Sequence, residues 1–108
     1  MFFGLYTGRD INQGVKEWKN TKGAVLLDVR TKEEYADYHI EGSMNIPLDR
    51  LDTVDGRVPD KATPLFVHCL SGGRSASAAA YLKKNGYSRV YDIGGIHSYR
   101  GETVSCSI

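Results

Sequence analysis

The sequence predicts an α/β protein in which helices cover both faces of a parallel sheet. Apolar runs typical of buried strands alternate with helical segments on short connections. The chain has 108 residues, of which 41% are hydrophobic and 25% charged, a size and composition that fit one globular domain spanning residues 1–108. Ligands of such sheets bind outside the carboxyl ends of the strands, so we expect a site there.

Four extended segments are the expected strands. They lie at residues 24–27, 44–47, 64–69 and 89–93. The first and third are continuous apolar runs, and Pro47 ends the second. We expect Gly94 and Gly95 to break the last strand before a less regular tail.

Capping residues place the helices between these strands. Asp10 is a good N-cap for a helix that Gly23 is expected to end. Thr31 and Glu34 form a capping box for a short helix that runs to about Tyr38. Two further helical segments are expected at residues 48–54 and 75–85, with a polar loop over residues 55–63.

Charge and composition argue against several classes of function. The net charge is +1, with 4 basic and 9 acidic side chains over residues 28–60 and 6 basic and 2 acidic ones over residues 61–108. This asymmetry favours a small anion near the C-terminal segment over nucleic acid, although an ordinary solvated surface accounts for it equally well. No apolar run is long enough for a membrane span and no leader is recognised, so we expect a cytoplasmic protein with no membrane partner.

The turn Cys69-Leu70-Ser71-Gly72-Gly73-Arg74-Ser75 lies where a buried strand ends and a helix begins. Two adjacent glycines let backbone N–H groups converge on one point, which the positive end of the helix also faces. A thiolate at Cys69 is stabilised there, so we expect its pKa to fall from about 8.5 towards neutrality. The alternative is that Cys69 is a small buried hydrophobe at the end of a strand. With Cys106 as the only other cysteine, we expect no disulfide, metal or cofactor.

At this turn the sequence resembles the rhodanese family, whose active-site loop has the pattern C-x-x-G-x-R, matched at Cys69, Gly72 and Arg74. Residues 27–30, 33–35 and 39–47 are similar to the family's first sequence block, and residues 94–96 to its closing one. The resemblance implies a three-layer α/β/α fold with a five-stranded parallel sheet of order 1-5-4-2-3.

The resemblance also implies a sulfurtransferase of the thiosulfate type. Cys69 would take a sulfane sulfur from a small anionic donor such as thiosulfate, hold it as a persulfide and pass it to cyanide or a thiol. Cys69 and Arg74 would be the catalytic residues, although the alternative for Arg74 is an ion pair with the acidic half of the chain. The donor sulfur would be bound by the other loop residues, Leu70, Ser71, Gly72, Gly73 and Ser75.

Residues outside the loop are expected to support it. Asp28 and Arg30 at the end of the first strand would brace the loop, with Glu33 joining them. Two other functions stay open. One is a sulfur-carrier or sensing module that a partner protein feeds in a sulfur relay. The other is a small phosphatase or arsenate reductase, although their C-x5-R loop is one residue longer than the loop from Cys69 to Arg74.

Three further residues are candidates for the mouth of the pocket or for a second thiol step. His97 and Tyr99 would line the mouth with Leu70, and plain packing is the alternative. Leu70 stands where the family often has a basic or polar residue, which weakens the case for thiosulfate as the natural donor. Cys106 would either resolve the persulfide as a disulfide or remain a free thiol of the tail.

Overall fold

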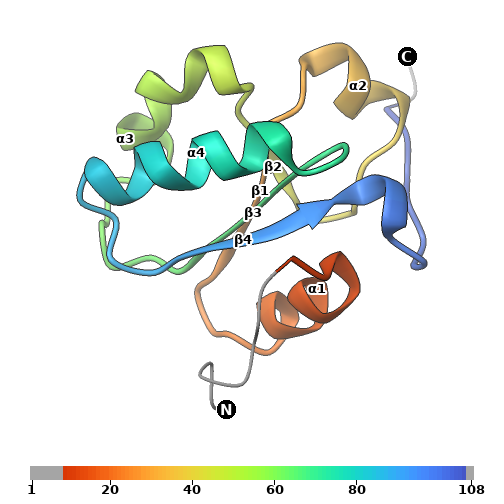
Figure 1. The fold of residues 1–108 in the computed structure, drawn as a ribbon, viewed down its shortest axis with the longest axis horizontal. Helices are drawn as coiled ribbons and strands as arrows, with labels where there is room; N and C mark the ends of the chain where they lie inside the picture. The colour runs from red at the N-terminus through yellow and green to blue at the C-terminus, as the bar shows by residue number, and fades with distance from the viewer. Residues whose placement is uncertain (1–8, 107–108) are drawn as a thin grey trace.

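The computed structural model describes residues 9–106, which form a parallel sheet with helices on both faces (Figure 1). The sheet has the strand order β2-β1-β3-β4. The strands are β1 (Val25–Asp28), β2 (Met44–Asn45), β3 (Leu65–Cys69) and β4 (Val90–Gly95). The helical segments are α1 (Ile11–Lys19), α2 (Lys32–Asp37), η2 (Leu48–Thr53), α3 (Val54–Arg57), α4 (Gly73–Lys84) and η3 (Ile96–Ser98).

The predicted fold class is confirmed, but the expected number of strands is wrong for the described residues. They contain four strands rather than five, and these four follow the expected order with its first strand missing. A first strand would have to precede α1, and residues 1–8 lie outside the described part of the chain.

Two hydrophobic clusters separate the layers. Figure 1 shows α1 on one side of the sheet and α3 and α4 on the other. On the α1 side, Phe66 and Ile93 from the sheet pack against Ile11 and Val15. α1 approaches the sheet so closely that a methyl group on Gly14 would overlap the side chain of Ile93. The other cluster contains Cys69, so the side chain of that residue faces the α3 and α4 side.

Both predicted N-caps are confirmed. Asp10 accepts hydrogen bonds from the main-chain N–H groups of Asn12 and Gln13, and α1 begins directly after it. Thr31 and Glu34 form the reciprocal capping box of α2. The predicted end of the first helix is wrong, because α1 stops at Lys19, well before Gly23.

Three other predicted boundaries are corrected. The segment expected to be a loop from residue 55 begins inside α3, and α4 starts at Gly73 rather than at residue 75. Gly94 and Gly95 do not break the last strand but belong to β4. The pairing with β3 shifts by one residue there, and Gly94 has a φ of 94°, so a glycine absorbs the bulge. Within residues 9–106, no helix has the length and apolar character needed to cross a bilayer.

Candidate active site

The loop between β3 and α4 wraps around the sulfur of Cys69. The main-chain N–H of Gly72 donates a hydrogen bond to Sγ at 3.0 Å, and that of Ser75 donates one at 3.3 Å. Gly72 has a φ of 111°, a left-handed conformation that favours glycine. This conformation starts the helix while turning the N–H of Gly72 back towards the sulfur. Two backbone dipoles and the N-terminus of α4 therefore converge on one atom.

The loop lowers the pKa of Cys69 despite the burial of the thiol. The side chain is 1% exposed, and this burial, the largest single effect, disfavours the thiolate. Hydrogen bonds from the Ser75 hydroxyl and from the N–H groups of Ser75, Gly72 and Ser71 together outweigh it. Leu70 connects the loop to η3, because its carbonyl accepts a hydrogen bond from the N–H of His97 at 3.1 Å. The geometry therefore provides a nucleophile that is ionised more readily than free cysteine.

Asp92 and Arg9 also contact the loop, and neither residue was predicted from the sequence. The Ser75 hydroxyl lies 2.8 Å from Oδ1 of Asp92 and 3.0 Å from the carbonyl oxygen of Gly72. Arg9 donates to that same carbonyl and forms an ion pair with Asp92 at 3.4 Å. The guanidinium of Arg9 occupies the space that a side chain at Gly72 would need. The sequence offered one indication of Asp92, because a carboxylate is unusual within a predicted strand.

Arg74 is held by a carboxylate rather than pointing at the sulfur. Its two terminal nitrogens lie 2.6 and 2.9 Å from the two carboxylate oxygens of Glu34. This two-pronged pair lowers the pKa of Glu34 to about 2. The ion pair with the acidic half of the chain, expected as the alternative for Arg74, is therefore present. The charge of Arg74 still favours the thiolate, because Cys69 is among the groups that raise the pKa of Arg74.

Asp28 and Arg30 form a buried ion pair at the end of β1, where Asp28 lies opposite His68 of β3. Nη2 of Arg30 lies 2.8 Å from Oδ2 of Asp28, and both side chains are at most 1% exposed. His68 lies on the same side, with Nε2 at 3.7 Å from that oxygen and Nδ1 at 3.2 Å from the carbonyl of Cys69. Burial lowers the pKa of His68, which is therefore neutral near pH 7. The expected partner Glu33 is exposed and makes no ion pair within residues 9–106.

The remaining candidates lie at the margins of the site. Nδ1 of His97 is 3.1 Å from the carbonyl of Leu70, while Leu70 and Tyr99 pack against the cluster on the α1 side. Cys106 is exposed, and its main-chain N–H donates to the carbonyl of Ala36 in α2. Among the described residues, no group of three His, Cys, Asp or Glu side chains could hold a metal ion.

Comparisons with known proteins agree on one family. The rhodanese-like domain family matches residues 11–102. A thiosulfate sulfurtransferase GlpE from Pseudomonas entomophila is 42% identical over 88 residues, which cover 76% of this chain and 79% of that protein. The adenylyltransferase and sulfurtransferase uba4 from Ogataea parapolymorpha is 36% identical over 82% of this chain, which spans only 23% of that protein. Among solved structures, a rhodanese with anions from E. coli superimposes with a TM-score of 0.70 at 32% identity and covers 76% of this chain and 98% of its own.

Proposed function

The chain belongs to the rhodanese-like domain family, and on that premise we propose that it is a sulfurtransferase that carries a sulfane sulfur on Cys69. One observation carries the proposal. The sulfur of Cys69 accepts hydrogen bonds from the N–H groups of Gly72 and Ser75, an arrangement that stabilises negative charge on that atom. A thiolate and a persulfide anion both need such stabilisation.

The proposed reaction has two steps. The Cys69 thiolate attacks the outer sulfur of thiosulfate, the bond between the two donor sulfurs breaks, and sulfite leaves with the electron pair. In the second step cyanide or a thiolate attacks the outer sulfur of the persulfide, and the electron pair of the breaking bond returns to Cys69. No oxidant or reductant is needed, because the sulfur moves between two nucleophiles.

The loop supplies the proposed binding groups. We assign the donor sulfur to the cradle formed by Leu70, Ser71, Gly72, Gly73 and Ser75, of which Gly72 and Ser75 already donate to the cysteine sulfur. Arg74 would act through its positive charge while Glu34 fixes its position. Asp28 and Arg30 would brace the loop by keeping the end of β1 rigid.

A second candidate function is a sulfur carrier that a partner protein loads. The match to uba4, a larger protein of which this chain resembles 23%, favours this alternative. It predicts a sulfur-loaded Cys69 together with slow turnover of free thiosulfate. We propose a cytosolic location in either case, because reducing compartments keep thiols such as Cys69 and Cys106 free.

The decisive experiment combines a rate with a mass. The purified chain, given thiosulfate and cyanide, should produce thiocyanate, and its intact mass after thiosulfate alone should rise by one sulfur atom. Cys69→Ser should abolish both results, whereas the matched variant Cys106→Ser should keep both. Thiocyanate formation that persists in Cys69→Ser would exclude the proposal, and loading without turnover would favour the carrier.

A further inference from the structure

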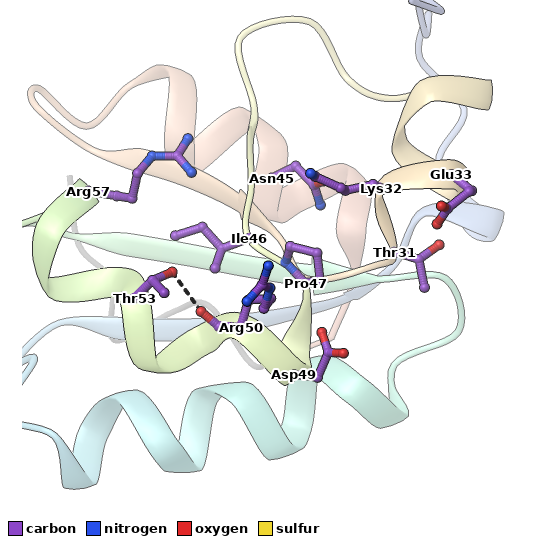
Figure 2. A pocket seen from close by; sticks show the side chains of 10 residues that line it. All are labelled: Thr31, Lys32, Glu33, Asn45, Ile46, Pro47, Asp49, Arg50, Thr53 and Arg57. Carbon is purple, nitrogen blue, oxygen red and sulfur yellow. Dashed lines mark hydrogen bonds between the residues drawn. The ribbon is translucent and has the colours of Figure 1, made fainter.

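A surface pocket of about 470 Å³ lies between the start of α2 and the segment that follows β2 (Figure 2). It sits outside the carboxyl ends of β1 and β2, where parallel sheets bind their ligands. Ile46 and Pro47 provide apolar surface, and the volume falls in the range of small-molecule sites.

Three cationic side chains line this pocket, Lys32, Arg50 and Arg57. Over residues 28–60 there are nine carboxylates and only four basic residues. One of the four, Arg30, is buried against Asp28, and the other three, Lys32, Arg50 and Arg57, all line the pocket. Within the described part of the chain, none of these three makes an ion pair. The cations of this acidic segment that form no ion pair among the described residues are therefore gathered around one pocket.

The two carboxylates of the pocket, Glu33 and Asp49, lie away from one of its cations, Arg57. Figure 2 shows Glu33 and Asp49 on the side away from Arg57, with the amine of Lys32 drawn between Glu33 and Arg57, and with Arg50 nearer to Asp49. An anion bound near Lys32 and Arg57 would therefore meet positive charge first. The Nδ2 of Asn45 is already used, because it donates to the carbonyls of Asp28 and Arg30.

A second cavity adjoins the pocket and is lined by one residue of the loop, Arg74. It measures about 290 Å³, is lined by Arg74 and Val29, and shares Thr31, Pro47 and Asp49 with the first pocket. Val29 and Ile46 also belong to the same hydrophobic cluster as Cys69. Both cavities therefore lie on the face of the sheet to which the cysteine side chain points.

From this arrangement, and resting on the proposed function, we propose that the pocket binds the sulfur acceptor, and that the acceptor is a small thiol carrying two or more carboxylates. Lys32, Arg50 and Arg57 would hold the carboxylates, and the thiol would reach the loop past Arg74. Thiosulfate is a poor fit, because its few atoms would leave most of the volume empty. The acceptor thiolate would attack the outer sulfur of the persulfide, and the electron pair of the broken bond would return to Cys69.

The test compares two acceptors after loading the chain with thiosulfate. Mercaptosuccinate carries two carboxylates, and 2-mercaptoethanol carries none. The double variant Lys32→Gln, Arg57→Gln should lower the ratio of kcat/KM for mercaptosuccinate to that for 2-mercaptoethanol by about 5- to 10-fold, mainly through the KM of mercaptosuccinate. The matched control Lys84→Gln removes an exposed charge at the far end of α4 and should leave the ratio unchanged.

The outcomes separate this proposal from the one on which it rests. If the ratio does not change in the double variant, or changes equally in Lys84→Gln, the acceptor site is excluded. A rise in the KM of thiosulfate alone would also exclude it, because the cations would then serve the donor. Failure of the wild-type chain to form thiocyanate from thiosulfate and cyanide would instead overturn the proposed function, since cyanide needs no carboxylate site.

Discussion

Replacing Ser75 with alanine removes the hydroxyl beside the sulfur of Cys69 but keeps the main-chain N–H that donates to the sulfur at 3.3 Å. The hydroxyl is one of the groups that lower the pKa of Cys69, against the opposing and larger effect of burial. A net hydrogen bond is worth about 1 kcal/mol, and one pKa unit corresponds to about 1.4 kcal/mol. Losing about 1 kcal/mol of stabilisation would lower the thiolate fraction about 5-fold at a pH below the pKa, so we expect the pKa of Cys69 to rise in Ser75→Ala.

The assay is the rate of alkylation of Cys69 by iodoacetamide as a function of pH, followed by intact mass. At a pH below the midpoint of this profile, the alkylation rate of Ser75→Ala should be about 3- to 10-fold lower than that of the wild-type chain, because a raised pKa leaves less thiolate. Ser77→Ala is the matched control, since Ser77 lies exposed on the same helix. An unchanged midpoint in Ser75→Ala, or an equal shift in Ser77→Ala, would refute the reasoning.

Two further predictions concern stability. Ionised Glu34 is favoured in the folded state, where its pKa is about 2 against an ordinary value of 4.5, so its contribution is present above about pH 4.5 and is lost as the pH falls towards 2. With allowance for solvent screening, we expect this contribution to the free energy of unfolding to be about 1 to 2 kcal/mol at pH 7. Urea unfolding at pH 7 and pH 3 should show that Glu34→Gln lacks this pH-dependent stabilisation, whereas the exposed control Glu33→Gln keeps it. Gly14→Ala should destabilise the chain by about 1 to 3 kcal/mol through overlap with the side chain of Ile93, whereas Gly56→Ala, with open space around it in α3, should stabilise it by up to about 1 kcal/mol. Thermal unfolding of the pair checks this, and a loss of stability of similar size in both would contradict it.

The fold was predictable where its signals are local. Thr31 and Glu34 of the capping box are three residues apart in the sequence. The apolar runs of β1 and β3 are each continuous stretches of a few residues. The wrong boundaries lie where tertiary contacts decide. Gly94 suggests a strand end by composition, yet in β4 it supplies the positive φ that lets the strand continue through a bulge.

The site was predictable only as far as its own loop. Cys69, Gly72 and Ser75 lie within seven residues, so spacing alone indicated converging N–H groups. Arg9 and Asp92 reach the same loop from distant parts of the chain, and no sequence pattern joins them to it. Sequence spacing also could not tell which acidic residue of α2 reaches the site. Glu33 was expected there, but it is Glu34, predicted only as a capping residue, that binds Arg74.

The 1% exposure of Cys69 has a consequence for chemical durability. Low-pKa thiols are the ones most easily oxidised by peroxide, first to sulfenic acid and then irreversibly to sulfinic and sulfonic acids, but oxidation also depends on access. Here the lowered pKa and the lack of exposure belong to the same atom, because the N–H groups that favour the thiolate also enclose it. An oxidant must therefore enter the same loop as the sulfur donor to reach this atom, so we expect burial to slow the oxidation that the lowered pKa would otherwise favour.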